Sequence, residues 1–248
     1  MRAIVLFLLN NIVTNRVLIW FGKDHIIKKF KANWSRTTFN TQKTVQENMG
    51  FSHDERIQVS INLVHQKIQE VFRRASGKTV LDVGCGAGLY LSDFQADTDL
   101  FGTDLSAEFL EKAKSLVKNG KFYCEDYRQV KFEKKFDFIY SVSVLQYIPP
   151  SCLAIFFQKL VSDLNSGGIV VIQYPHALSK WDTLYPDLSY VQYSPLKVKQ
   201  QSERFFDVVD HVHSFDGRQL NLKFDNQRYD TELEKSFRNG AIIVLKKN

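Results

Sequence analysis

The sequence predicts an α/β fold built on a doubly wound, mostly parallel sheet. Short apolar runs of strand length alternate with helix-patterned segments from residue 55 to residue 172. The first of these runs, residues 79–84, leads into a glycine-rich turn. The second run ends at an acid, Asp104, twenty residues after Gly84. A strand, a glycine turn, a helix and a strand that ends in an acid together indicate a nucleotide-binding unit.

The first half of this alternation opens with a helix predicted over residues 55–75. In it, Ile57, Ile61, Val64 and Ile68 recur at intervals of three and four. The elements that follow are a strand at 79–84, a helix at 89–94, a strand at 100–103, a helix capped by Ser106 and ended by Asn119-Gly120, and a strand at 121–124.

The second half continues the pattern and then changes. A strand at 136–140 is followed by a helix that starts at Pro149-Pro150 and ends at 165–168. Residues 169–172 form a continuous apolar run, as expected of a strand buried on both faces. After a helix that begins at Ser194-Pro195, strands at 205–215 and 241–245 have little helix between them. These late strands predict an antiparallel end to the sheet.

Composition is that of an ordinary globular protein. The chain has 248 residues, with 44% hydrophobic and 24% charged residues, which is enough for one large domain with additional caps. Its three cysteines, Cys85, Cys124 and Cys152, form no C-x-x-C pair. This scattered set argues against a disulfide framework and against a metal site, and it favours reduced thiols in a cytoplasmic protein.

The positive charge is confined to an N-terminal appendage, residues 1–54, for which we predict a basic, partly amphipathic helical cap. Residues 1–36 hold seven basic residues and one acidic residue, which accounts for the entire net charge of +6. The apolar run at 3–9 is too short to span a bilayer. One interpretation is a helix packed on the domain, and another is a helix lying on an anionic membrane surface. A nucleic-acid-binding arm is the weakest interpretation, because the remainder of the chain is neutral.

The glycine turn narrows the kind of ligand. Gly84, Gly86 and Gly88 give the spacing G-x-G-x-G, whereas the dinucleotide fingerprint G-x-G-x-x-G needs a glycine at Leu89. With Leu81-Asp82-Val83 before it, this segment resembles the first motif of the class I S-adenosylmethionine-dependent methyltransferases. A glycine turn without a ligand is the alternative. The resemblance extends to the C-terminus, and residues 55–248 would form the methyltransferase domain.

The resemblance implies a Rossmann-like sheet of seven strands, with the seventh inserted antiparallel beside the fifth. It also implies that S-adenosylmethionine binds at the carboxyl ends of the first strands. Asp82 would hold the methionine ammonium, Asp104 the ribose hydroxyls and Asp126 the adenine amino group. The other implied binding residues are Gly84, Gly86 and Gly88 in the turn, Leu105 and Tyr127 beside the adenine, and Ser141 beside the methionine. The alternatives are that Asp82 caps local backbone N–H groups and that Asp104 is the N-cap of the next helix.

A general base is harder to identify. Small-molecule relatives commonly have histidine where this chain has Gln146 and Tyr147. His176, after the strand at 169–172, is the best placed candidate, although a single histidine in a loop is more often solvated or structural. His53 is a second candidate. Aromatic residues within 177–195 predict either a substrate lid or a loop that packs on itself.

We therefore expect methyl transfer from S-adenosylmethionine to an oxygen or nitrogen atom of a small-molecule or lipid-linked acceptor. A nicotinamide-dependent oxidoreductase and a non-catalytic S-adenosylmethionine-binding protein are the alternatives. The neutral core and the absence of an N/D-P-P-Y-type sequence argue against methylation of nucleic-acid bases. The expected location is the cytoplasm, with peripheral contact to the inner face of a membrane as a second interpretation.

Overall fold

The structure is a computed structural model. It describes residues 55–75, 77–94, 96–177, 182–185, 190–214, 216–220, 222 and 240–248. The predicted cap at 1–54, together with His53, lies outside these residues, so its interpretation as a packed or membrane-bound helix stays a prediction. No helix in the described part of the chain combines the length and the apolar character needed to cross a bilayer.

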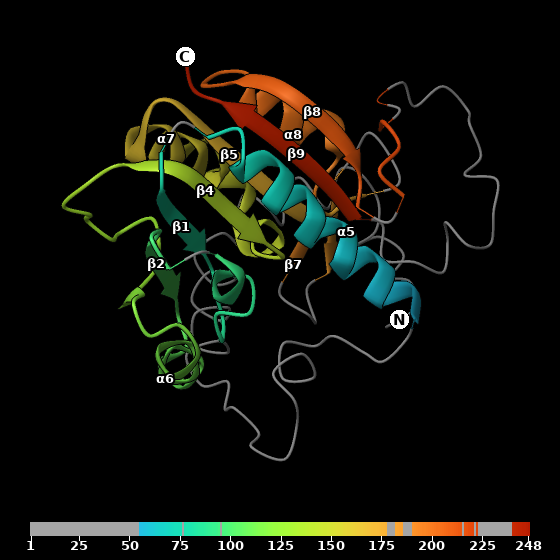
Figure 1. Cartoon of the computed structure of the whole chain (residues 1–248). Coiled ribbons are helices and arrows are strands. Elements are labelled where there is room, and N and C mark those ends of the chain that lie inside the picture. The colour runs from blue at the N-terminus through green and yellow to red at the C-terminus, as the bar shows by residue number, and fades with distance from the viewer. Residues whose placement is uncertain are drawn as a thin grey trace, which may run out of the picture.

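The fold is organised around a seven-stranded sheet with the strand order β3-β2-β1-β4-β5-β9-β8. The strands are β1 (Thr79–Val83), β2 (Asp99–Asp104), β3 (Lys121–Cys124), β4 (Phe136–Val142), β5 (Leu164–Pro175), β8 (Asp207–His213) and β9 (Gly240–Lys246). β9 runs antiparallel to both of its neighbours, β5 and β8, while the pairs from β3 to β5 are parallel. Figure 1 shows the arrow of β9 pointing opposite to that of β4. The predicted mostly parallel sheet with an antiparallel end is confirmed.

The strand order reverses at β1, which positions the candidate site. β2 and β3 extend the sheet on one side of β1, and β4 and β5 extend it on the other. In open α/β sheets the connections on the two sides of such a point diverge, and ligands bind in the crevice at the carboxyl ends of the strands there. The turn after β1 and the ends of β2 and β4 are therefore where a ligand is expected.

Helices cover both faces of the sheet. α5 (Glu55–Phe72) and α6 (Ala107–Leu116) contribute to one core layer, in which Ile68 and Leu110 pack with Val80 and Val171. α7 (Leu153–Asp163) and α8 (Pro195–Ser202) contribute to the layer on the opposite face. In Figure 1, α5 lies diagonally across the front of the sheet. The central strands β1, β4, β5 and β9 thus bury alternate side chains in two different cores.

The described residues of the aromatic segment after β5 include two short antiparallel strands. β6 (Thr183–Tyr185) and β7 (Tyr190–Gln192) form a separate two-stranded sheet. Beside it, Tyr193 is fully buried, and its hydroxyl donates a hydrogen bond to the carbonyl of Ile148. Trp181 lies outside the described residues. Tyr193 therefore has a structural role, while a lid function of the rest of the segment stays a prediction.

Three sequence-based boundaries are wrong. The helix predicted at 89–94 is a single 3-10 turn, η1 (Leu91–Asp93), because the turn from Gly84 to Gly88 and the loop to β2 leave no length for a full helix. The glycines at 167 and 168, predicted to end a helix, lie within β5, which begins at Leu164. The predicted strand at 205–215 is shorter, because residues 202–206 instead bond back onto the end of α8.

Candidate active site

The turn after β1 is held in a conformation that needs glycine. Gly84 and Gly86 have φ values of +76° and +51°, in the left-handed region that other residues seldom adopt. A Cβ atom on Gly84 would also overlap Cγ2 of Val144, in the turn after β4. The backbone N–H groups of Gly84 and Cys85 both donate to the carbonyl of Thr103, at 2.8 and 2.9 Å. The glycine turn is thus hydrogen-bonded to β2 and packed against the turn after β4.

Gly88 has a different position from the other two glycines. It is buried, and a Cβ atom there would lie 3.1 Å from the Cβ of Ala113 on α6. Its φ of +79° also favours glycine. Gly88 therefore allows α6 to approach the turn closely, as the third glycine of nucleotide-binding turns often does.

Asp104, at the end of β2, is oriented by two backbone N–H groups. Its Oδ2 accepts from Gly86 and its Oδ1 accepts from Ser106, both at 2.9 Å. The hydroxyl of Ser106, and not Asp104, caps α6 by accepting from the N–H of Phe109. Desolvation raises the pKa of Asp104 above its ordinary value, although the backbone hydrogen bonds oppose this. Asp104 therefore presents a fixed carboxylate with remaining lone pairs at the mouth of the turn.

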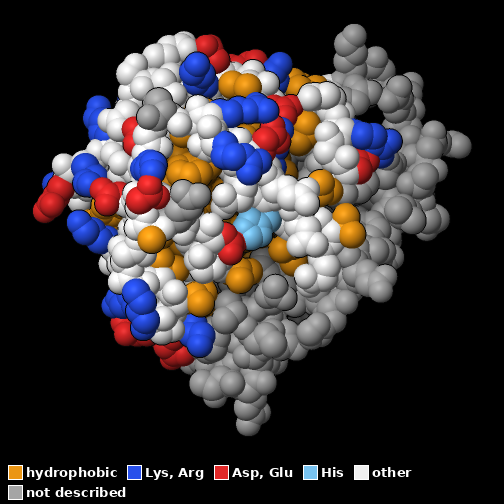
Figure 2. All heavy atoms as spheres, in the orientation of Figure 1, with side chains coloured by type: hydrophobic (Ala, Val, Ile, Leu, Met, Phe, Trp, Pro, Cys, Tyr) orange, Lys and Arg blue, Asp and Glu red, His pale blue; other side chains and the backbone are white. Residues whose placement is uncertain are grey.

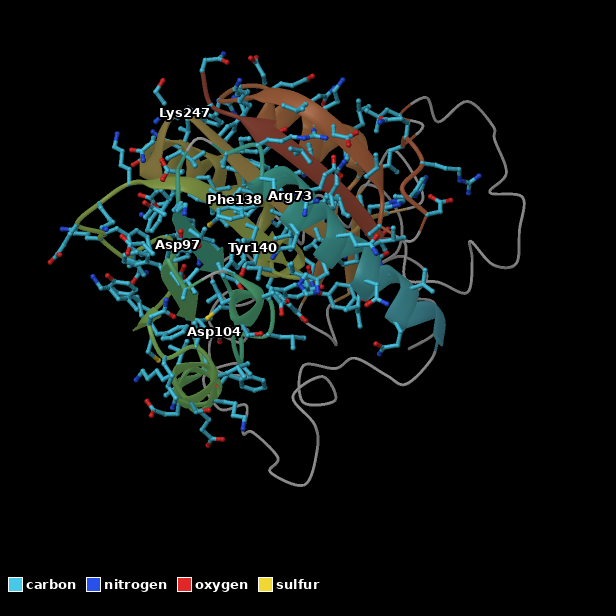
Figure 3. The ribbon with its side chains drawn as sticks, viewed as in Figure 1. Arg73, Asp97, Asp104, Phe138, Tyr140 and Lys247 are labelled. Atoms are coloured by element: carbon cyan, nitrogen blue, oxygen red, sulfur yellow. The ribbon has the colours of Figure 1, made fainter. Side chains whose placement is uncertain are left out.

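Asp82, within β1, is a buried carboxylate without a cation. Its side chain is 2% exposed, and no Lys, Arg or His in the described part of the chain forms an ion pair with it. Burial raises its pKa well above the ordinary value, and the nearby Asp104 carboxylate adds to this, while the Tyr140 hydroxyl opposes it. The Tyr140 hydroxyl is fully buried and has no hydrogen bond of standard geometry. Figure 3 shows Tyr140 and Asp104 toward the same end of the sheet. Among the described residues, Asp82 therefore has no cationic partner.

Asp126, predicted to accept from an adenine amino group, is paired with Arg128. Oδ1 accepts from Nε of Arg128 at 2.9 Å, and Oδ2 accepts from Nη2 at 2.5 Å. Asp126 is 8% exposed, whereas Glu125, the alternative acid, is exposed. Arg128, which sequence reasoning did not identify, thus orients the Asp126 carboxylate, and the role of Asp126 toward an adenine stays a prediction.

Tyr127 lies in the core and not on an open surface. Its ring is 6% exposed and contacts Phe156 edge-on at a centroid distance of 5.8 Å. Its hydroxyl donates to Asp163 at 2.9 Å. A packing role explains these contacts, so the prediction that this ring flanks an adenine gains no support from them. Leu105, the other predicted flanking residue, is half-buried after β2.

Ser141 is fully buried, and its hydroxyl donates to the carbonyl of Val83 at 3.0 Å, which ties β4 to β1. Two residues later, Ser143 has a φ of +56°, the only positive φ of a non-glycine residue in the described part of the chain. Its N–H and hydroxyl both donate to Oε1 of Gln173, each at 3.0 Å. Sequence reasoning did not identify Ser143 or Gln173. The positive φ of Ser143, which places it against Gln173, has no signature in the sequence.

His176 is placed after β5 with its ring fixed. It is fully buried, and Nδ1 lies 2.9 Å from the carbonyl of Ala177. Since a carbonyl only accepts, Nδ1 carries the proton and Nε2 keeps its lone pair. Nε2 has no partner among the described residues, and burial lowers the pKa of His176 to about 4. His176 is therefore a neutral imidazole and not a solvated loop histidine.

The comparison with known proteins agrees with this geometry. Residues 80–168, from β1 to the beginning of β5, match a family described as a methyltransferase domain. These residues thus match a methyltransferase domain, which supports the predicted resemblance to the class I S-adenosylmethionine-dependent methyltransferases. The matched stretch includes the glycine turn, Asp104 and Asp126, so the motif that carried the resemblance lies inside it.

Two curated relatives align with the chain over about 100 residues. A probable fatty acid methyltransferase of Pseudomonas putida is 34% identical over 40% of this chain and 27% of its own length. A trans-aconitate 2-methyltransferase of Agrobacterium fabrum is 33% identical over 40% of this chain and 39% of its own length. The chain thus aligns with less than half of the length of either relative.

Among solved structures, the N-methyltransferase NodS of Bradyrhizobium japonicum in complex with S-adenosyl-L-homocysteine has a similar fold. The TM-score is 0.58, with 14% identity, and the match covers 90% of this chain and 98% of NodS. At this identity the likeness concerns the fold alone.

Proposed function

We propose that this protein transfers a methyl group from S-adenosylmethionine to a small-molecule or lipid-linked acceptor, at oxygen or nitrogen. The observation that carries the proposal is the pairing of Asp104 with the N–H of Gly86 beside the cation-free carboxylate of Asp82. A fixed acid at the end of β2 fits a ribose diol. An unpaired buried carboxylate fits the ammonium group of a methionine moiety.

The residues present fit this cofactor group by group. Asp82 would hold the ammonium, the turn at Gly84 and Gly86 would allow close backbone approach, and Asp104 would accept from the ribose hydroxyls. Asp126, oriented by Arg128, would accept from the adenine amino group. When bound, S-adenosylmethionine supplies an electrophilic methyl carbon on a sulfonium. The main task of the protein is then to align an acceptor with that carbon and to exclude water.

Fewer observations bear on the part of the site that would bind the methyl acceptor. The two relatives described above are named for fatty acids and for trans-aconitate, which are carboxylic acids. Both names support an organic acid as the acceptor class. His176 is our candidate for a group that accepts a proton or a hydrogen bond from a hydroxyl acceptor through Nε2. The basic residues at 1–36 support contact with an anionic membrane surface from the cytoplasmic side.

The described side chains on the face shown in Figure 2 give no support for nucleic-acid binding. Figure 2 shows basic and acidic side chains interspersed over one face, without an extended basic patch. Long phosphate backbones are instead bound by continuous basic surfaces. The acceptor that we propose is correspondingly a small molecule or a lipid-linked group.

Two measurements test the proposal. Calorimetry with S-adenosylhomocysteine and with NADH separates a methyltransferase from an oxidoreductase, since we expect binding of the first compound alone. Incubation with S-adenosylmethionine labelled in the methyl group, with trans-aconitate, palmitate or a fractionated cell extract as acceptor, should then yield a labelled organic product. Binding of S-adenosylhomocysteine without any labelled product would favour the non-catalytic alternative. Tight binding of NADH would contradict the proposal.

A further inference from the structure

Gln173 near the end of β5 has an amide group whose orientation is fixed. Its Oε1 atom accepts from both the N–H and the hydroxyl of Ser143. Because a backbone N–H only donates, the oxygen and not the nitrogen of this amide faces Ser143. The two N–H donors on Nε2 must therefore point the other way.

The two donors on Nε2 face a polar region, and no described residue accepts a hydrogen bond from them. A Cβ atom on Gly240 of β9 would lie 3.3 Å from Nε2 of Gln173 and would overlap Oγ of Ser214. Ser60 on α5 approaches the same place, with its Oγ 3.4 Å from that of Ser214. No acceptor for Nε2 is found among the residues that the structure describes, and the Gln173 side chain is only half-buried. A ligand atom can therefore accept a hydrogen bond from Nε2 of Gln173.

Ser143, which holds the Gln173 amide in place, has a strained backbone and lies next to the predicted binding site of the methyl donor. Ser143 has a φ of +56°, which costs a non-glycine residue about 1–2 kcal/mol. The next residue, Val144, packs directly on Gly84 in the glycine turn. Gln173 is therefore connected to that turn through two residues of one tight segment. Strain that persists where the chain closes a ligand site is more often functional than accidental.

We propose that Gln173 recognises the methyl acceptor, and that its Nε2 donors select an acceptor that presents a carboxylate or carbonyl oxygen. This inference rests on the proposed methyl transfer. The Nε2 group has two N–H donors and no acceptor, so it can bind an oxygen lone pair and cannot accept a hydrogen bond from a protonated amine. Gln173 acts on specificity by contacting the acceptor, while Ser143 is a positioning residue that acts through Gln173.

A carboxylate acceptor also needs no general base, which suits a site whose candidate base, His176, has a pKa lowered to about 4. One oxygen of the acceptor accepts from Gln173, and a lone pair of the other forms the new bond to the methyl carbon. The carbon–sulfur bond breaks, and its electron pair stays on sulfur. The products are a methyl ester and the neutral thioether, and no proton has to leave. His176, which is neutral, is then not needed to remove one.

The test uses the nearly isosteric substitution Gln173→Glu, which keeps an oxygen toward Ser143 and replaces the two donors with a second carboxylate oxygen. The matched control is Gln201→Glu on α8, whose Oε1 accepts from Arg204 at 3.1 Å, outside the site. Affinity for S-adenosylhomocysteine is measured first by calorimetry, followed by kcat/KM for labelled methyl transfer to trans-aconitate, palmitate and the diamine putrescine. Full-length ¹⁵N-labelled protein supplies a second readout, because the side-chain amide signal that is missing in Gln173→Glu belongs to Gln173.

We expect wild type and both variants to bind S-adenosylhomocysteine alike. We expect Gln173→Glu to lower kcat/KM for an acid by about tenfold or more and Gln201→Glu to leave it unchanged. The Gln173 amide signal should shift when the acid is added to the complex. Equal kcat/KM in wild type and Gln173→Glu, transfer to putrescine alone, or an amide signal that no acid shifts at its solubility limit would each overturn the inference while the proposed function survives. A wild-type protein that does not bind S-adenosylhomocysteine overturns both.

Discussion

The backbone N–H of Gly86 donates a hydrogen bond to Oδ2 of Asp104 across 2.9 Å, so the glycine turn and the acid that ends β2 form one unit. The sequence separates these residues by a whole turn-and-strand segment, and the parallel pairing of β1 with β2 brings them together. This contact fixes the carboxylate before any ligand arrives. It is the kind of preorganisation that lowers the entropic cost of binding.

The first prediction concerns Asp82, where ligand binding and stability oppose each other. Its pKa is raised mainly by burial, so the folded protein retains a proton that the unfolded chain releases at the ordinary pKa. The stability that Asp82 contributes is therefore present at low pH and is lost as pH rises through the raised pKa. Asp82→Asn should make the protein more stable at neutral pH and should weaken binding of S-adenosylhomocysteine at least about tenfold.

Thermal unfolding across pH and calorimetry at neutral pH measure these two effects. The control is Asp97→Asn, at an exposed aspartate whose pKa is lowered by its hydrogen bond to Lys78. That variant should not gain stability at neutral pH and should bind normally. A less stable Asp82→Asn protein, or one with unchanged affinity, would show that the carboxylate has a structural partner.

The second prediction concerns the left-handed backbone at Ser143. Ser143→Ala and Ser143→Gly both remove the hydroxyl that donates to Gln173, but only glycine adopts a φ of +56° without strain. Ser143→Gly should therefore be more stable than Ser143→Ala by roughly 1 kcal/mol, the reverse of the order usual elsewhere. Urea denaturation measures this difference, and the ordinary order would contradict the assigned conformation.

The third prediction is a pH profile without a histidine titration. Burial lowers the pKa of His176 to about 4, so its imidazole is already neutral at the ordinary histidine pKa and above. The kcat for the best acceptor should show no inflection near the ordinary histidine pKa of about 6.5. A bell-shaped profile with a limb there that is lost in His176→Gln would instead identify His176 as a solvated general base.

The fourth prediction separates the fold from the site. Nζ of Lys247 donates to the carbonyls of Val161 and Leu164, both at 2.7 Å, and so satisfies the C-terminal end of α7. Figure 3 shows Lys247 at the end of the sheet remote from Asp104. Lys247→Met should lower the free energy of unfolding by about 1 kcal/mol without altering ligand affinity. The neighbouring Lys246→Met is the control, since Lys246 is exposed. Equal stability of the two variants would refute the capping role.

Much of the fold could be predicted from the sequence, because apolar runs bounded by glycines mark buried strands in any α/β protein. The positions and chain order of β1 to β4 follow from this pattern, as do the apolar centre of β5 and Ser106 as the helix cap. The family resemblance, and not periodicity, predicted that the last strand lies antiparallel beside β5. η1 was mistaken for a helix because the apolar residues within 89–94 do not show how many residues the glycine turn takes up.

The site was predictable only where a residue type implies its role. Acids after strands and glycines in turns carry such a signal, and Asp104 lies where it was expected. The partner of Asp126 was not foreseen, because an arginine two residues later is usually a surface charge. Tyr127 follows β3 and, from sequence alone, either face of the sheet was open to it; its hydroxyl is bonded to Asp163 in the core. The amide of Gln173 is set by a backbone conformation at Ser143, which depends on tertiary contacts.

The most direct test of the central claim is calorimetric titration of S-adenosylhomocysteine into wild type, Asp104→Ala and Asp99→Ala. Asp99 lies at the opposite end of β2 and forms an ion pair with Lys134. It is therefore a control with the same side chain outside the proposed site. We expect Asp104→Ala to lose ~1.5–3 kcal/mol of binding free energy, the scale of hydrogen bonds to a charged group, and Asp99→Ala to bind as wild type does. Equal affinities of the three proteins would contradict the assignment of this turn as the adenosine site.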